Sequence, residues 1–280
     1  MNNGLVWNWM STPVVTATPE MSLTEARRLM NEKQIRALPV VEEDQLVGII
    51  TRRGLLRLDL SFILETDEAF SLKVEPEEVR VGEVATRNPI TISPKSSIPK
   101  AARIMLENKI TALPVMEAGK LVGILTNSDL LRFILSEYPT LKRKLLVSHY
   151  MTEDVVTIEP DTSLLEAHRL MGAKRIRSLV VMDGDRLAGL VTRTDLMSSD
   201  PSRLASRNNQ ELSLKILTQP VEKVMSRSLI TISPSEPVTR AAELMLRNKI
   251  HCLPVVDEQE KLAGIITESD LFLMIVQKFF

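Results

Sequence analysis

The sequence repeats itself four times, and this repetition constrains the fold more than any other feature. Each copy begins with a short Met-Ser, Ala-Thr or Met-Thr landmark, and a proline follows nine positions after its first residue. These landmarks and prolines are Met10 and Pro19, Ala85 and Pro94, Met151 and Pro160, and Met225 and Pro234. A repeat of this kind predicts one supersecondary unit that buries its apolar face against neighbouring copies.

The spacing of the copies is uneven and predicts two tandem pairs. A glycine three residues before a threonine recurs in each copy, and successive glycines are 75, 66 and 75 residues apart. These glycines are Gly48, Gly123, Gly189 and Gly264. We therefore expect a first pair at 1–140, with units at about 6–60 and 81–136. A second pair is expected at 141–280, with units at about 147–200 and 221–278.

Each copy has the pattern of a small βαββα unit, an α/β fold with α+β-like character. The β-branched run at Val155–Ile158 predicts a strand. Ser22-x-x-Glu25 and Ser163-x-x-Glu166 predict capped helix starts. Two apolar strands follow, and Asp183-Gly184 between them predicts a hairpin turn. A unit of about 50 residues cannot bury both helices alone, so we expect the units to pair.

Composition sets limits on partners and location. The 280 residues carry a net charge of −1, so neither nucleic acid nor an anionic membrane is an expected partner. A single cysteine, Cys252, excludes an internal disulfide. The start lacks signal-peptide character, and the apolar run LFLMIV is far shorter than the roughly 20 residues of a membrane span. A cytoplasmic location is expected.

Signatures of catalysis are missing from the sequence. Its three histidines do not occur in an H-E-x-x-H pattern, and one cysteine cannot form a cysteine-based zinc cluster. Neither a P-loop nor a G-x-G-x-x-G motif is present. We therefore expect no enzymatic activity, no catalytic cofactor and no metal.

Three motifs in succession resemble the cystathionine-β-synthase (CBS) domain family. They are M-[ST]-x-x-[VLI]-x-T-x-x-P, I-x-[AS]-L-P-V and G-[IL]-[ILV]-T-x-x-D, and together the four copies cover nearly the whole chain. The paired arrangement is similar to Bateman modules, to the γ subunit of AMP-activated protein kinase and to stand-alone prokaryotic CBS proteins. This resemblance implies two pseudo-twofold pairs with ligand clefts between units, and it is compatible with a flat disc.

The resemblance also implies which residues bind a ligand. In the family, the Thr of T-x-x-D approaches a phosphate or ribose oxygen, and the Asp accepts hydrogen bonds from the ribose hydroxyls. A carboxylate suits this role because it offers only acceptors. The residues so implied are Thr126, Ser128, Asp129, Thr192, Thr194, Asp195, Thr267, Ser269 and Asp270. The first copy has Gly54 in place of Asp, so its cleft is expected to be empty, weak or adapted to another ligand. Arg52 and Arg53 could bind phosphate there or could simply be solvated.

The I-x-[AS] segment of the partner unit is expected, by the same resemblance, to contact the base and the phosphates. These residues are Ile35, Arg36, Ala37, Ile176, Arg177, Ser178, Ile250, His251 and Cys252. Two arginines and a histidine after the isoleucine favour a phosphorylated ligand, whereas Thr111 in the second copy does not.

Structural explanations compete with these assignments. The Asp residues could serve only as helix caps, although one carboxylate could cap with one oxygen and bind ribose with the other. The Thr residues could simply end strands, Arg36 and Arg177 could be solvated, and His251 could lie at the core edge. Met30, Met105, Met171 and Met245 are expected in the core, and Trp7 and Trp9 are expected to cover an open end of the first unit.

Three functions follow as hypotheses. The leading one is a regulatory sensor of AMP, ADP or ATP that signals by changing the geometry of paired units. The others are a sensor of S-adenosylmethionine or a related nucleoside, and a ligand-free interaction scaffold. A homodimer and an unknown protein partner remain possible, while DNA binding is disfavoured by the charge.

Overall fold

The computed structural model describes residues 4–52, 54–55, 79–137, 145–198 and 217–278. The chain divides into two compact units, one formed by Met1–Pro139 with Phe272–Phe280 and the other by Thr140–Leu271. The first contains repeats one and two, and the second contains repeat three and repeat four up to Leu271. The predicted division placed the boundary one residue later and assigned the last nine residues to the second half.

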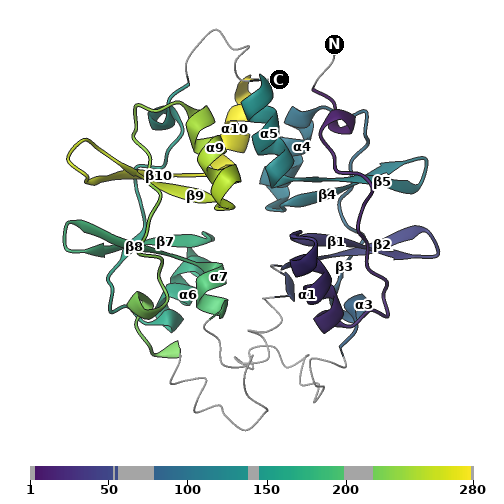
Figure 1. The fold of residues 1–280 in the computed structure, drawn as a ribbon, viewed down its shortest axis with the longest axis horizontal. Helices are drawn as coiled ribbons and strands as arrows, with labels where there is room; N and C mark the ends of the chain where they lie inside the picture. Colours follow the sequence, from purple (N-terminus) through teal and green to yellow (C-terminus); the bar gives the residue numbers. More distant parts are fainter. Residues whose placement is uncertain (1–3, 53, 56–78, 138–144, 199–216, 279–280) are drawn as a thin grey trace. The chain divides into compact units, whose positions relative to one another are not determined.

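Small sheets and flanking helices make up each unit (Figure 1). The first unit contains η1 (Val6–Asn8), α1 (Leu23–Glu32), β1 (Ala37–Glu42), β2 (Gln45–Thr51), α3 (Val81–Val84), β3 (Thr86–Arg87), α4 (Ile98–Asn108), β4 (Ala112–Glu117), β5 (Lys120–Thr126) and α5 (Asn127–Glu137). The remaining elements are η4 (Val147–His149), β6 (Thr157–Ile158), α6 (Leu164–Ala173), β7 (Ser178–Asp183), β8 (Arg186–Thr192), α7 (Arg193–Ser198), η6 (Val221–Lys223), α9 (Val238–Asn248), β9 (Cys252–Val256), β10 (Leu262–Thr267) and α10 (Glu268–Lys278).

An antiparallel hairpin forms the centre of every repeat: β1–β2, β4–β5, β7–β8 and β9–β10. The predicted turn after Asp183 is confirmed, with Gly184 at a φ of +58°. The predicted first strand is shorter than its apolar run suggests. It is the two-residue β6 in the third repeat, parallel to β7, and a single parallel bridge such as Ala17–Val40 elsewhere. The βαββα prediction is thus confirmed, with a reduced first strand.

The long helices begin and pack as their sequences predict. Ser22 Oγ accepts a hydrogen bond from Glu25 N at 3.2 Å, and Ser163 Oγ accepts one from Glu166 N at 3.1 Å. These bonds confirm the serine half of the predicted capping boxes. The four helix methionines are buried in the cores as predicted: Met30, Met105, Met171 and Met245.

The two repeats of each pair exchange their landmark segments: the segment that begins one repeat packs on the hairpin of the other. Val6 N donates to Ser96 O at 2.9 Å, and Ser11 forms a bridge with Ile124, so the N-terminal segment adds to the second repeat. The ring of Trp9 contacts Phe133 of α5 edge-on at 5.5 Å. The expectation that Trp7 and Trp9 cover an open end of the first repeat is therefore wrong, because Trp9 packs on the second repeat and Trp7 is exposed. An edge strand pairs with whichever free edge lies nearest, and here that edge belongs to the other repeat.

The exchange is reciprocal and occurs in both pairs. In the first pair, β3 in the segment 80–87 pairs with β2 of the first repeat. In the second pair, Thr152 bridges Ile265 of the fourth repeat, and Ser226 bridges Leu190 of the third. Each repeat therefore completes its partner's sheet, which explains physically why units of this size occur in pairs.

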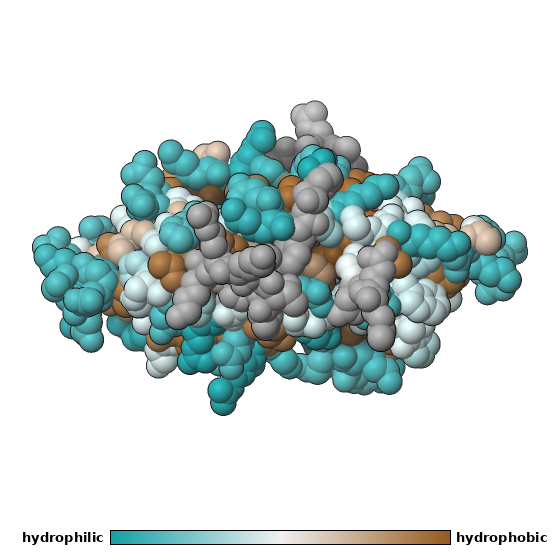
Figure 2. Space-filling view, turned by 90° about the horizontal axis from the view of Figure 1, so that it is seen from above, coloured by the Kyte–Doolittle hydropathy of each residue, from teal (hydrophilic) through white to brown (hydrophobic). Residues whose placement is uncertain are grey.

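Buried residues gather beside each hairpin, and the outer surface is mixed. One core cluster lies in the first repeat and includes Leu38 and Met30, and another lies in the third and includes Leu179 and Met171. On the face seen in Figure 2, hydrophobic residues appear between hydrophilic ones. Among the described residues, no helix has both the length and the apolar character required to cross a bilayer.

Candidate functional site

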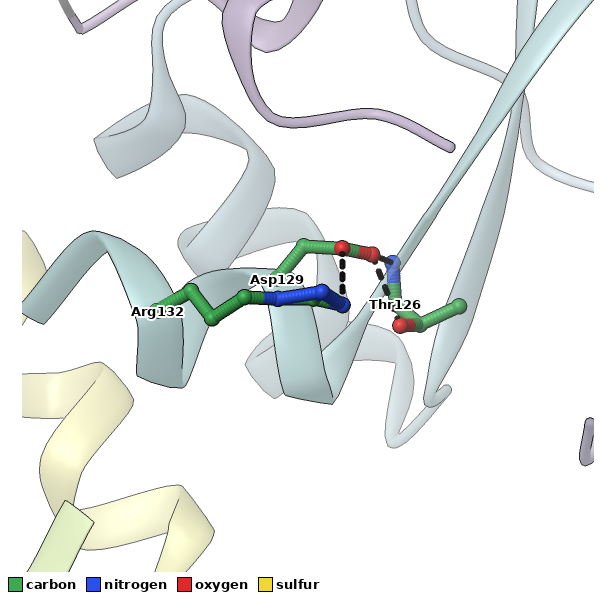
Figure 3. A network of polar contacts seen from close by, with 3 residues as sticks. All are labelled: Thr126, Asp129 and Arg132. Atoms are coloured by element: carbon green, nitrogen blue, oxygen red, sulfur yellow. Dashed lines mark hydrogen bonds and ion pairs between the residues drawn. The ribbon is translucent and has the colours of Figure 1, made fainter. Parts of the chain in front are cut away.

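The T-x-x-D motif of the second repeat forms a closed polar network at the start of α5. Asp129 Oδ2 accepts hydrogen bonds from Thr126 N at 2.6 Å and from Thr126 Oγ1 at 2.7 Å (Figure 3). The other carboxylate oxygen, Oδ1, accepts from Arg132 NH2 at 3.0 Å. Both oxygens of Asp129 are thus engaged within their own repeat, and the residue is only 1% exposed.

In repeats three and four the Oδ2 atom of the motif's Asp accepts the same two hydrogen bonds. Asp195 accepts from Thr192 N and Oγ1 at 2.8 and 2.7 Å, and Asp270 accepts from Thr267 N and Oγ1 at 2.7 and 2.8 Å. The capping interpretation of the motif is therefore realised in all three repeats. A carboxylate that caps through one oxygen retains lone pairs on the other. Binding of ribose by these residues remains a prediction.

Burial makes two of these carboxylates electrostatically costly. Desolvation raises the pKa of Asp129 and of Asp270 above the ordinary value of 3.8, against the lowering effect of the hydrogen bonds from their threonines. Arg132 adds a second lowering effect at Asp129. A further hydrogen-bond donor at Asp270, such as a ribose hydroxyl, would therefore offset part of its desolvation.

In the first repeat Thr51 still caps the following turn, although Gly54 stands where the other repeats have Asp. Gly54 N donates to Thr51 Oγ1 at 3.0 Å, so the threonine still begins the helical turn. Arg52, for which the sequence left phosphate binding and simple solvation open, donates from Nη2 to Asn31 Oδ1 of α1 at 2.6 Å. Arg53 lies outside the described residues. The first repeat thus differs from the others in chemistry as well as in sequence.

The I-x-[AS] segment and the T-x-x-D motif of one repeat lie side by side in its hairpin. Strand pairing places Ala37 opposite Thr51, Ser178 opposite Thr192 and Cys252 opposite Thr267. The carbonyl of the residue after the isoleucine accepts a hydrogen bond across the hairpin. Arg193 N donates to Arg177 O at 2.9 Å, and Glu268 N donates to His251 O at 3.0 Å. One lone pair of each of these carbonyls is already used.

Residues from the third and fourth repeats meet in the second pair. Arg177 NH2 lies 3.8 Å from Glu268 Oε2, with the arginine side chain 29% exposed and the glutamate side chain 6%. Ser178 of the third repeat forms a hydrogen bond with the Cys252 thiol of the fourth. Glu268 is not among the residues expected from the sequence. The sequence does distinguish this residue. The position after the strand threonine is Arg52, Asn127, Arg193 or Glu268 in the four repeats, and only the last is acidic.

The corresponding contact in the first pair is apolar. Ala37 of the first repeat and Ala112 and Ile124 of the second form one buried cluster, against which Val14 and Ile49 pack. Arg36 is exposed, whereas Arg177 and His251 are partly buried. The two pairs therefore present different environments to any ligand. Among the residues that the structure describes, no group of His, Cys, Asp and Glu is placed to hold a metal ion.

We predict that Cys252 resists alkylation in the folded protein. Burial raises its pKa to about 11, and the residue is 2% exposed. At pH 8 only about 0.1% of such a thiol is thiolate, the reactive form. Labelling with iodoacetamide followed by mass spectrometry should be at least 100-fold slower in native protein than in urea. Rapid native labelling would show that the contact between the third and fourth repeats opens readily.

Comparison with known proteins identifies the repeated unit. The model of the CBS domain matches residues 6–61, 81–136, 147–201 and 221–276. The uncharacterised protein MJ1225 of Methanocaldococcus jannaschii is 30% identical over 267 residues, covering 92% of this chain and 94% of its own length. Its crystal structure, described as a proposed archaeal homologue of γ-AMPK, matches with a TM-score of 0.77 over 97% of this chain and 99% of that one.

Two further matches are more distant. The γ subunit of 5′-AMP-activated protein kinase from Dictyostelium discoideum is 22% identical over 94% of this chain, which spans 49% of that subunit. An uncharacterised conserved protein from Pyrococcus horikoshii has the same fold, with a TM-score of 0.67 and 24% identity over 97% of this chain.

Proposed function

This chain belongs to the CBS domain family, and from that premise we propose that it is a non-catalytic regulatory sensor of AMP, ADP or ATP. The nucleoside would bind between the paired repeats, with ribose on the T-x-x-D carboxylates of the third and fourth repeats and phosphates on the cationic residues of the I-x-[AS] segments. Similarity to an AMP-activated kinase γ subunit supports this choice of ligand.

One observation carries the proposal: the two motifs meet across repeats. Arg177 belongs to the I-x-[AS] segment of the third repeat, and Glu268 lies inside the T-x-x-D motif of the fourth, two residues before Asp270. A ligand held by both motifs would therefore touch two repeats at once. Such a ligand can change the relative arrangement of the repeats, provided that it binds one arrangement more tightly than another.

The test is calorimetric titration with AMP, ADP and ATP of the wild type and an Asp270→Asn variant. Asparagine can still accept the cap bond from Thr267 N, but it lacks the charge that strengthens bonds from ribose hydroxyls. We expect affinity to fall about tenfold or more, since a hydrogen bond to a charged group contributes about 1.5–3 kcal/mol.

The matched control is Asp257→Asn, an acid that caps the exposed turn before β10. Asp257 Oδ1 accepts from Gln259 N and Lys261 N at 2.9 and 2.8 Å. This variant should bind as the wild type does. Equal affinity in the wild type and both variants would remove the ribose assignment, and absence of binding in the wild type would favour the ligand-free scaffold.

A second candidate ligand is S-adenosylmethionine, and Glu268 is the observation that favours it. A nearly buried carboxylate beside Arg177 repels phosphate and attracts a cation such as a sulfonium. Titration with this ligand separates the two cases. Arg177→Ala should weaken the binding of a phosphorylated ligand and leave that of S-adenosylmethionine unchanged or stronger.

A further inference from the structure

The first repeat has a hollow because one landmark methionine is an alanine. In the other three repeats the exchanged landmark methionine packs on the strand glycine. Met225 Sδ lies 2.5 Å, and Met151 Sδ 3.0 Å, from the positions that a Cβ would take on Gly189 and Gly264. Met10 packs on Gly123 in the same way. On Gly48 the exchanged residue is Ala85, which ends at its Cβ.

The space left by the shorter side chain is open. A hollow of about 330 Å³ lies over Gly48 of β2, beside α3 and β3. Its lining residues are Pro19, Val40, Glu42, Val47, Gly48, Gly82, Ala85 and Arg87. Val40, Gly48 and Arg87 follow one another across β1, β2 and β3, and Gly48 leaves the middle of this row without a side chain. A flexible, unbranched side chain like that of methionine fills irregular gaps of this type well.

Two opposite charges border the hollow. Glu42 is at the end of β1 and Arg87 is in β3, on either side of β2. Arg87 pairs with Gly48, whereas Glu42 pairs with Gln45, so the two residues line the hollow at different points along β2. Both residues are exposed, and within the described ranges neither makes an ion pair with the other or with a third residue.

We propose that this hollow binds a free α-amino acid with an unbranched apolar side chain, of the methionine or norleucine type. The side chain would occupy the space that methionine fills in the other repeats. The ligand carboxylate would pair with Arg87, whose guanidinium matches a carboxylate in two parallel hydrogen bonds, and the ammonium would pair with Glu42. The site is separate from the proposed nucleotide clefts, because it contains no T-x-x-D or I-x-[AS] residue.

Such a ligand would tie the two repeats of the first pair together. Ala85 and Arg87 belong to the exchanged segment that begins the second repeat, whereas Val40 and Glu42 belong to the first repeat. A bound amino acid would contact both and would stabilise the exchanged arrangement by an amount that grows with the ratio of its concentration to its dissociation constant. The nutrient state of the cell would thereby act on the same pair of repeats through a second input.

The test measures binding of L-methionine and L-norleucine to full-length protein by calorimetry and saturation-transfer NMR. We expect a dissociation constant of about 1 mM or tighter for both ligands. The Ala85→Met variant should fill the hollow, lose binding at least tenfold and melt at a higher temperature than the wild type. Arg87→Gln should also lose binding at least fivefold, whereas Arg28→Gln, at an exposed arginine of α1, should not.

Three results would overturn the proposal: no response of the wild type to either amino acid, full binding by Ala85→Met, or equal binding of hexylamine, which has no carboxylate. If Ala85→Met does not fold, Arg87→Gln and Glu42→Gln decide the matter, because both residues are exposed and their replacement leaves the core unchanged. Titration of the same variants with AMP and ATP tests the nucleotide proposal separately, so either proposal can fail without the other.

Discussion

Replacing Gly264 by alanine is expected to lower the free energy of unfolding by about 2 kcal/mol, within the range for overpacking a tight site. A Cβ on Gly264 would lie 2.9 Å from the carbonyl oxygen of Thr152 and 3.0 Å from Met151 Sδ. The Thr152 carbonyl cannot move freely, because it accepts a hydrogen bond from Ile265 N at 2.9 Å. The added methyl group must therefore displace the exchanged segment from β10.

Gly172 is the matched control because a Cβ there would meet nothing within 4 Å. It is exposed on α6 of the same unit, so Gly172→Ala should stabilise the helix by up to about 1 kcal/mol. Urea denaturation followed by circular dichroism measures both variants. If Gly264→Ala were as stable as the wild type, the exchange of segments in the second pair would be wrong.

Replacing Glu268 by glutamine is expected to increase the affinity for AMP and ATP about tenfold or more. Glu268 would compete with a bound phosphate for Arg177 and would repel it, and two like charges about 6 Å apart repel by about 3 kcal/mol at an effective dielectric constant of about 20. Arg177 is partly exposed, so water can solvate it after the substitution. The affinity for S-adenosylmethionine should fall in the same variant. Calorimetric titration gives both values.

Glu222→Gln provides a control with the same charge change. Glu222 pairs with Arg227 at the same distance of 3.8 Å, but both side chains are largely exposed and the pair lies outside the proposed cleft. Exposed pairs of this kind contribute little, so neither ligand affinity should change. Weaker AMP binding in Glu268→Gln than in the wild type would mean that Glu268 supports the phosphate site instead of opposing it.

Local patterns were sufficient to predict the unit and its caps. The hairpin turn at Gly184 and the caps at Ser22 and Ser163 depend on residues within four positions of one another, so the sequence alone carries the information. The alternative between cap and ligand residue for Asp129 could not be resolved in the same way. Its contacts with Thr126 and Arg132 are equally local, but a role in ligand binding depends on which groups of the other repeat face the carboxylate.

The sequence by itself determined that four units exist, that they are paired, and that they belong to a known family, because repeats and their spacing are properties of the chain alone. Only the tertiary structure decided where the landmark segments pack. Met10, Ala85, Met151 and Met225 show the same local pattern whether they cover their own repeat or the next one. The choice depends on which sheet edge lies close in space, and the contact of Glu268 with Arg177 and the hollow beside Ala85 both depend on that packing.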